Sequence, residues 1–310
     1  MKYVMVGSGA VGGYFGGLLQ QAGHEVVFVA RGSQLNALRE GGLTICDGDQ
    51  EIHLPSVTVT DDLTTIGAVD HVLISVKTWQ VAEIALKLPL LKKESTRFLT
   101  LQNGVEAPEI VAAQVERGQT LGGVVRGFFR IKAPGTVRHN GVQPAIVFGQ
   151  IDGQRTPPTE QLLRDLSALP IYAELSNDIE AALWEKFAMV TALGGVGAVT
   201  RSTIGEIRDY PPTWQMFQKV MIEIVRLAQT RGIHLQDEMI DRVLKFVSSF
   251  PPELTTSMQR DIMAGLPSEL DAQTGAVVRL GREVSAATPI NQLIYDSLIL
   301  QENRARAAHS

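Results

Sequence analysis

Residues near the N-terminus have the types and spacing of a dinucleotide-binding loop. In such a G-x-G-x-x-G turn the first glycine permits a tight bend, the second lets the backbone approach a pyrophosphate, and the third lets helix and strand pack closely. The free N–H groups that open the helix would hold the pyrophosphate. An ordinary strand-to-helix turn is the alternative, and the strand–helix–strand context disfavours it. The loop lies between a strand pattern at 2–6 and a helical pattern at 14–21, and consists of Gly7, Ser8, Gly9, Ala10, Val11 and Gly12.

Arg31 indicates which dinucleotide this loop would bind. It follows directly after a second apolar strand pattern at 25–30. Folds that bind NAD usually place an acidic residue here, where it holds the ribose 2′-hydroxyl, and this chain has no Asp or Glu beside Arg31. A guanidinium suits a 2′-phosphate, although an exposed arginine after a strand is also common. The sequence therefore favours NADP(H) over NAD(H).

Composition limits the class of protein. The 310 residues are enough for two domains with sizeable cores, and a hydrophobic content of 45% is that of a soluble globular protein. The formal net charge of -5 argues against a nucleic-acid partner. The single cysteine, Cys46, suits a reducing compartment. No apolar stretch reaches the ~18 residues of a membrane span, so we expect a cytoplasmic protein whose partner is a small molecule.

The strands of the first half position two further polar residues. Apolar strand patterns at 70–76 and 97–101 end directly before Lys77 and before Gln102-Asn103-Gly104. Ligands of open α/β sheets bind outside the carboxyl ends of the strands, so Lys77 and Asn103 are expected at the cofactor edge. A solvated lysine and a plain Asn-Gly turn are the alternatives.

The remaining pattern predicts a Rossmann α/β domain over 1–176 and an all-α domain over 177–310. In the first, a hairpin is expected at 43–54, a helix at 78–88, and strands at 122–131, 135–139, 145–148 and 171–175 with turns at Pro134-Gly135 and Asn140-Gly141. A cleft between two such domains is the default place for a ligand. The helices expected in the second half are 178–193, 213–231, 237–249, 255–264, 267–281 and 288–306.

Lys186 is the candidate for chemistry in the helical half. It lies at the edge of a segment that is almost entirely apolar or glycine from 187 to 199. Such a lysine either extends its amine to water or protonates and polarises a carbonyl group. Ser257 and Glu269 lie on later helices, where a solvated helix face is the alternative. Because no cluster of metal ligands appears, hydride transfer to a carbonyl is the natural chemistry beside a nicotinamide cofactor.

Several motifs together resemble one known family. They are the glycine loop with Arg31, Ser75-Val76-Lys77-Thr78-Trp79-Gln80, Leu101-Gln102-Asn103-Gly104, Trp184-Glu185-Lys186, and Ser257-Met258-Gln259-Arg260-Asp261 followed by Glu269. On these residues the chain resembles the ketopantoate reductases (2-dehydropantoate 2-reductases) over nearly its whole length.

The resemblance implies a role for each of these side chains. Lys186 would donate the proton to the carbonyl oxygen of a 2-oxo acid, and Glu269 would support Lys186 and the cofactor end of the site. Asn103 would contact nicotinamide ribose and substrate, and Ser257 would bind the substrate's carboxylate or hydroxyl group. Arg31 and Lys77 would face the adenosine-phosphate side.

The chain departs from the family pattern where substrate is bound. The family carries asparagines at the positions of Val190, Gly194 and Ile204, and these bind substrate hydroxyl groups. Their loss makes the pocket more apolar, and a site without such a partner should discriminate less for hydroxylated substrates. The expected activity is NADPH-dependent reduction of 2-dehydropantoate to pantoate. The alternatives are a reductase of a more hydrophobic 2-oxo acid and a non-catalytic NADP-binding sensor, and a homodimer through the helical half is plausible.

Overall fold

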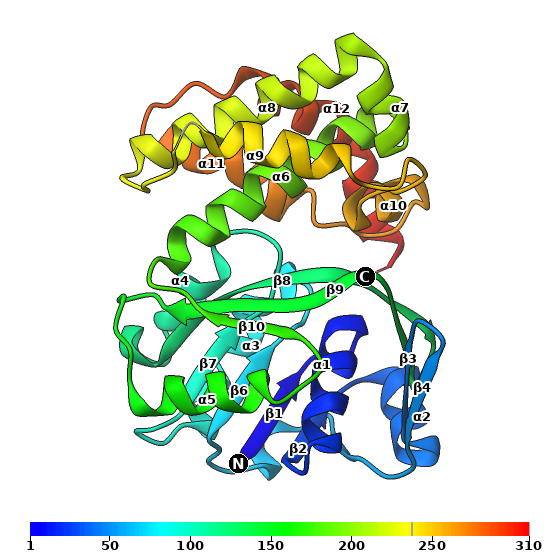
Figure 1. Ribbon diagram of the computed structural model, residues 1–310, viewed down its shortest axis with the longest axis vertical. Coiled ribbons are helices and arrows are strands. Elements are labelled where there is room, and N and C mark those ends of the chain that lie inside the picture. Colours follow the sequence, from blue (N-terminus) through cyan, green and yellow to red (C-terminus); the bar gives the residue numbers. More distant parts are fainter. Residues whose placement is uncertain (237, 310) are drawn as a thin grey trace. The chain divides into compact units, whose positions relative to one another are not determined.

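Residues 1–236 and 238–309 are described by a computed structural model in which the chain forms two units (Figure 1). Unit 1 comprises Met1–Gln102 and Glu106–Ile179. Unit 2 comprises Asn103–Val105 and the chain from Glu180 onward. The units therefore divide between Ile179 and Glu180, and the short loop that carries Asn103 belongs with the helices.

Unit 1 is built on a ten-stranded mixed sheet with the order β4-β3-β9-β8-β7-β6-β1-β2-β5, and β10 pairs with β9. The six strands from β8 to β5 are parallel, as a Rossmann domain requires. The strands are β1 (Lys2–Val6), β2 (Glu25–Val29), β3 (Leu43–Asp47), β4 (Gln50–Leu54), β5 (Thr58–Thr60), β6 (His71–Ile74), β7 (Arg97–Thr100), β8 (Thr120–Ala133), β9 (Thr136–Gln150) and β10 (Tyr172–Leu175).

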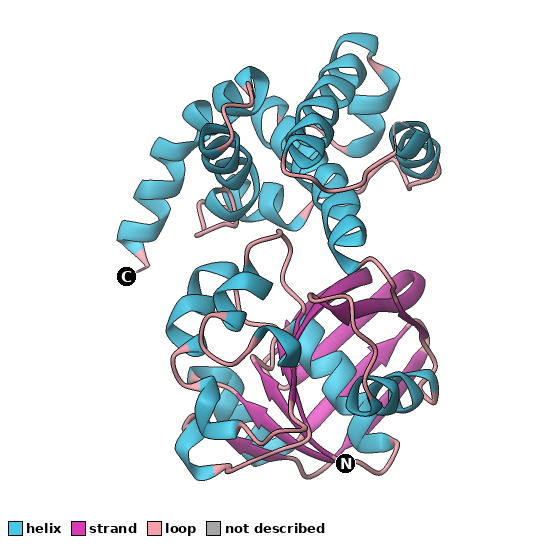
Figure 2. Ribbon diagram, turned by 90° about the vertical axis from the view of Figure 1, so that its left-hand side faces the viewer, coloured by secondary structure: helices cyan, strands magenta, loops and turns pink. Residues whose placement is uncertain are grey.

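Helices cover both faces of this sheet (Figure 2). Alternate residues of β1 point to opposite faces, so Tyr3 and Met5 belong to a core with α1 and α5, whereas Val4 and Val6 belong to a core with α3 and α4. The helices of unit 1 are α1 (Ala10–Gln21), α2 (Gly32–Gly41), α3 (Val81–Ala85), α4 (Ala107–Ala112) and α5 (Pro157–Ser167), with the short 3₁₀ turns η1 (Leu63–Thr65), η2 (Thr78–Gln80), η3 (Leu88–Leu91) and η4 (Arg117–Gln119).

Two expectations for unit 1 are wrong. The predicted turn at Asn140-Gly141 does not form, because β9 continues through it: Gly141 has a φ of +87° and Asn140 pairs with Phe128 of β8. A shift in the pairing register beside Phe128 absorbs the irregularity. The helix expected at 78–88 is also divided, into η2, α3 and η3.

Every element of regular secondary structure among the described residues of unit 2 is a helix or helical turn. Its long helix α6 runs through Gly194, Gly195 and Gly197, although the pattern predicted an end at 193. A Cβ added at Gly195 would lie 3.2 Å from the Ile294 side chain, and one at Gly197 would lie 2.5 Å from Gln259, so these glycines let neighbouring helices approach. The elements are α6 (Ile179–Thr200), α7 (Ile204–Asp209), α8 (Pro211–Thr230), α9 (Glu238–Ser248), α10 (Ser257–Met263), the π-helical turn η5 (Asp271–Gly275), α11 (Ala276–Glu283) and α12 (Pro289–Ala308).

The helix expected at 237–249 begins with Asp237, which lies outside the described residues. By length and composition alone, helix α6 could cross a membrane. However, 67% of its most apolar 18-residue stretch is buried inside the protein. A mostly buried helix of this kind is typical of the core of a soluble protein.

His71 makes the stability of unit 1 sensitive to acid. Its ring is 1% exposed, packs 5.1 Å from the Tyr3 ring, and has no hydrogen-bond partner on either nitrogen among the described residues. Burial lowers the pKa of His71 from 6.5 to about 4. The folded state therefore favours the neutral imidazole. Its contribution to stability is complete above pH 6.5 and is lost as the pH falls from 6.5 toward 4.

We expect this one group to remove about 3 kcal/mol of unfolding free energy by pH 4. Urea unfolding of the wild type and of His71→Leu at pH 7, 5.5 and 4 measures the effect, and the variant should lose less stability on acidification. His24→Leu is the matched control, because His24 also contacts the Tyr3 ring but is only half-buried. Equal acid sensitivity in the wild type and His71→Leu would contradict the assignment.

Candidate active site

The glycine loop has the shape of a dinucleotide cradle. Gly7 has a φ of +97°, which glycine tolerates readily. A Cβ at Gly12 would lie 1.9 Å from the Gly7 carbonyl oxygen, so only glycine fits there. A Cβ at Gly9, by contrast, would meet nothing within 4 Å. The loop is thus closed against the protein at Gly7 and Gly12 and open at Gly9, where a pyrophosphate has to approach.

Hydrogen bonds with three other segments hold this loop in place. Ser75 Oγ donates to the Gly7 carbonyl oxygen at 2.5 Å, and Ser8 Oγ donates to the Val29 carbonyl oxygen at 3.1 Å. Gln34 Nε2 donates to the Ser8 carbonyl oxygen at 2.8 Å. Helix α1 begins at Ala10, with Val11 as its next residue and Gly9 at its N-cap. Residues 7–12 therefore form one anchored strand-to-helix turn, and they suit the phosphates of a dinucleotide.

Arg31 lies directly before α2, as its N-cap residue, and it has a partner that the sequence does not reveal. Its Nη2 atom lies 3.2 Å from Glu83 Oε1, and both side chains are 57% exposed. Glu83 is in the first turn of α3. Directly before η2, exposed Lys77 holds its Nζ atom 5.7 Å from the centre of the Trp79 ring. This edge of unit 1 therefore carries cations beside the Glu83 carboxylate.

The three residues of the Gln102-Asn103-Gly104 segment have different structural roles. Gln102 Nε2 donates to the carbonyl oxygens of Ile74 and Val76, at 2.9 and 3.1 Å. Gly104 has a φ of +108°, and a Cβ there would lie 3.2 Å from the Ala272 carbonyl oxygen. The tight turn at Gly104 thus brings Asn103 against the segment that carries Glu269.

Asn103 and Glu269 meet in unit 2. Asn103 Nδ2 donates to Glu269 Oε2 at 3.3 Å, and the Glu269 side chain is buried. The same carboxylate oxygen accepts from Gln273 Nε2 at 3.5 Å. Gln273 was not predicted; it is 2% exposed and lies in η5, a π-helical turn of the kind that often marks functional sites. A glutamine in a helical pattern gives no such signal in the sequence.

Lys186 lies on the half-buried face of α6. That face also carries Met189 and Val190, one turn further along, whereas Phe187 and Ala188 point into the core. Lys186 is therefore partly buried, on the side of the helix that stays partly accessible. This is a position from which an amine can reach a ligand.

The three positions where the family pattern has asparagine, Val190, Gly194 and Ile204, differ in their surroundings. Val190 is half-buried on α6, and Ile204 is buried at the start of α7. A Cβ at Gly194 would lie 2.9 Å from Met258 Cε, 3.1 Å from Thr256 Oγ1 and 3.5 Å from Gln273 Oε1. Met258 is buried directly after Ser257, which is exposed as the first residue of α10. The space beside position 194 is thus bordered most closely by a methionine methyl group and next by two polar oxygen atoms.

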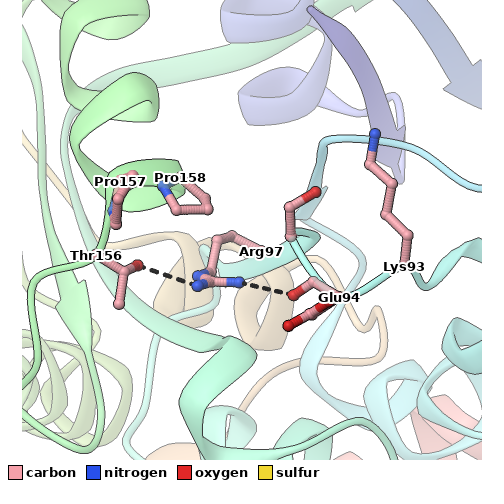
Figure 3. A pocket seen from close by; sticks show the side chains of 7 residues that line it. Lys93, Glu94, Arg97, Thr156, Pro157 and Pro158 are labelled. Atoms are coloured by element: carbon pink, nitrogen blue, oxygen red, sulfur yellow. Dashed lines mark hydrogen bonds between the residues drawn. The ribbon is translucent and has the colours of Figure 1, made fainter.

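A separate surface pocket lies where β7 and α5 begin (Figure 3). Buried Arg97 donates there to the Glu94 carbonyl oxygen at 3.4 Å and to Thr156 Oγ1 at 3.0 Å. None of the predicted site residues lines this pocket, and it adjoins the amino end of β7, away from the strand ends that lead to the glycine loop, Lys77 and Asn103. The hydrogen bonds of Arg97 thus connect the loop before β7 with the loop before α5. Among the described residues, no group of three or more His, Cys, Asp and Glu side chains is arranged to hold a metal ion.

Several known proteins resemble this chain over nearly its whole length. A curated 2-dehydropantoate 2-reductase from Archaeoglobus fulgidus is 29% identical over 290 residues, covering 94% of each chain. The crystal structure of a PanE/ApbA family ketopantoate reductase from Ralstonia eutropha JMP134 superposes with a TM-score of 0.89 at 28% identity, covering 99% of this chain and 100% of that one. A D-mandelate dehydrogenase with NADH and anilino(oxo)acetate shares the fold, with a TM-score of 0.90 at 20% identity over 99% of this chain and 100% of that one.

Family profiles cover nearly all of the sequence. The family described as Ketopantoate reductase PanE/ApbA matches residues 3–153, and its C-terminal counterpart matches residues 178–302. The first match contains the glycine loop, Arg31, Lys77 and Asn103, and the second contains Lys186, Ser257 and Glu269. The chain therefore belongs to the ketopantoate reductase family of oxidoreductases.

Proposed function

We propose that this protein uses NADPH to reduce a 2-oxo acid to the 2-hydroxy acid, and that its substrate is 2-dehydropantoate. The product would then be pantoate, for pantothenate biosynthesis. The observation that carries the proposal is the hydrogen bond from Asn103 to Glu269. Asn103 follows β7, at whose carboxyl end the cofactor is expected, and it belongs with Glu269 to unit 2.

Hydride transfer to a carbonyl carbon is the chemistry that a nicotinamide supplies when bound. In this proposal the Lys186 ammonium group stabilises the negative charge that develops on the carbonyl oxygen and then donates the proton to it. Glu269 supports Lys186, Asn103 contacts the nicotinamide ribose and the substrate, and Ser257 binds the substrate. Residues 7–12 hold the pyrophosphate, while Arg31 and Lys77 face the adenosine-phosphate side.

A second candidate substrate is a more hydrophobic 2-oxo acid. It is favoured by Met258, whose methyl group takes the space beside Gly194 that an asparagine side chain would need. A methyl group offers no partner to the hydroxyl group of 2-dehydropantoate, so with that substrate the partner would have to be a polar atom beside it, Thr256 Oγ1 or Gln273 Oε1.

The two substrates can be separated with compounds that differ by a single hydroxyl group. NADPH oxidation should be followed with 2-dehydropantoate and with 3,3-dimethyl-2-oxobutanoate, alongside 2-oxoisovalerate and benzoylformate. A kcat/KM for 2-dehydropantoate at least about tenfold above that for its deoxy analogue would support the first proposal, because a site that hydrogen-bonds a hydroxyl rejects the analogue without it. The reverse order would support the hydrophobic substrate. NADPH binding without oxidation by any of these acids would indicate a sensor.

Replacing Arg31 with alanine should weaken NADPH binding at least about tenfold and NADH binding much less, because a charge-assisted contact to the 2′-phosphate is lost. Fluorescence titration of both nucleotides measures the effect. Arg39→Ala is the control, since Arg39 is an exposed arginine in the last turn of the same helix. Equal weakening of NADPH and NADH by Arg31→Ala would show that Arg31 does not read the 2′-phosphate.

A further inference from the structure

We infer that Glu83 supplies the carboxylate that the end of β2 lacks, and that the Arg31–Glu83 pair lets this chain accept NADH as well as NADPH. The inference rests on the proposed function, because it takes the glycine loop and Arg31 as the dinucleotide site. In NAD-binding folds an acidic residue at the end of the second strand accepts a hydrogen bond from the ribose 2′-hydroxyl. Here that stretch reads Ala30, Arg31, Gly32 and Ser33, with no acid.

The fold brings a carboxylate to the same place from another segment. In the sheet, β1 lies between β2 and β6, and all three strands are parallel, so their carboxyl ends share one edge. Arg31 follows β2 at that edge, and η2 and α3 follow β6. Glu83, in the first turn of α3, reaches Arg31 with its Oε1 atom 3.2 Å from Nη2. The pair is thus set where the second strand ends.

The pair is open to a ligand. Both side chains are 57% exposed, and an ion pair in water is strongly screened and contributes little to stability. A nucleotide can therefore bind to either partner without disturbing the fold. The exposed Lys77 near the start of the same segment adds a second cation at this edge.

The two nucleotides would use this pair differently. The 2′-phosphate of NADPH, with a charge of about -1.5 to -2, would be attracted by Arg31 and repelled by Glu83. The 2′-hydroxyl of NADH would donate to the Glu83 carboxylate, while Arg31 remained paired with it. Glu83 would thereby weaken the binding of NADPH and strengthen the binding of NADH. We expect the two dissociation constants of the wild type to lie within about tenfold of each other.

Glu83→Gln tests this assignment with little change in size. Dissociation constants for NADPH and NADH should be measured by fluorescence titration at low and high salt. The variant should bind NADPH more tightly and NADH more weakly, shifting the ratio of the two constants by about tenfold or more toward NADPH. The gain for NADPH should shrink at high salt, because it comes from removing a charge repulsion.

Glu109→Gln is the matched control. Glu109 also forms an exposed ion pair, with Arg117, but that pair adjoins the amino end of β8, away from the carboxyl-end edge that carries Arg31. The ratio of the NADPH and NADH dissociation constants in Glu109→Gln should equal that of the wild type. Both variants should keep the wild-type melting temperature.

An unchanged ratio in Glu83→Gln would overturn the inference, as would a wild type that binds NADH more than about 100-fold more weakly than NADPH. Titration needs no turnover, so the two proposals can fail separately. A wild type that binds both nucleotides but reduces no 2-oxo acid would contradict the reaction and leave the role of Glu83 standing. A wild type that binds neither would contradict both.

Discussion

Replacing Lys186 with alanine is expected to lower kcat for the 2-oxo acid by about 100-fold or more. The variant removes the ammonium group that is proposed to stabilise the developing negative charge and to supply the proton. NADPH affinity should stay within about twofold of the wild type, because the variant leaves the proposed dinucleotide-binding residues 7–12, Arg31 and Asn103 in place. Steady-state NADPH oxidation and fluorescence titration of NADPH together separate the two effects.

Two further lysine variants serve as controls for this result. Lys219→Ala removes an exposed lysine from α8 and should leave both kcat and KM unchanged. Lys186→Arg keeps the positive charge but holds its proton too tightly to donate it, so it should bind substrate and turn over slowly. Normal turnover in Lys186→Ala would remove Lys186 from the mechanism.

The second large effect is expected from replacing two glycines of the same loop with alanine. One replacement should destabilise the fold, and the other should leave its stability unchanged. Gly12→Ala puts a methyl group 1.9 Å from the Gly7 carbonyl oxygen and 2.4 Å from Ser75 Oγ, so the backbone must move. We expect it to cost about 3 kcal/mol or more of unfolding free energy and to abolish NADPH binding. Gly9→Ala meets no atom within 4 Å, so stability should be kept while NADPH binding weakens by about tenfold or more.

Thermal unfolding and NADPH titration distinguish these outcomes. Gly41→Ala is the control, because a Cβ at Gly41 also meets nothing within 4 Å and that glycine lies at the far end of α2. It should change neither stability nor binding. If Gly9→Ala bound NADPH as tightly as the wild type, the open side of the loop would not be where the pyrophosphate lies.

The sequence predicts the parts of unit 1 that are encoded locally. The unit β1–loop–α1–β2 can be predicted because its strand patterns and its glycine spacing lie within the first 31 residues. β5 was missed because three residues give no periodicity, and the strand exists through its pairing with β2. The extension of α6 through Gly194 was missed for a similar reason, since it depends on the side chains packed against those glycines.

The candidate site shows the same limit. Asn103 and Glu269 can be chosen from motifs, but their hydrogen bond spans 166 residues and depends on the fold. Gln273 and Glu83 have no motif of their own. Gln273 is identified only by its hydrogen bond to Glu269, and Glu83 only by its ion pair with Arg31. Residue types and spacing thus indicate the chemistry, whereas the partners that adjust it are found only in three dimensions.

The measurement that tests the central claim most directly is hydride transfer itself. The purified protein should be incubated with NADPH deuterated at both C4 positions and with the panel of 2-oxo acids, and the products examined by mass spectrometry. We expect a 2-hydroxy acid that carries one deuterium, bound to C2, from at least one of these acids. Consumption of the nucleotide without a deuterated 2-hydroxy acid, or tight binding with no product from any acid, would contradict the claim that this chain is a 2-oxo acid reductase.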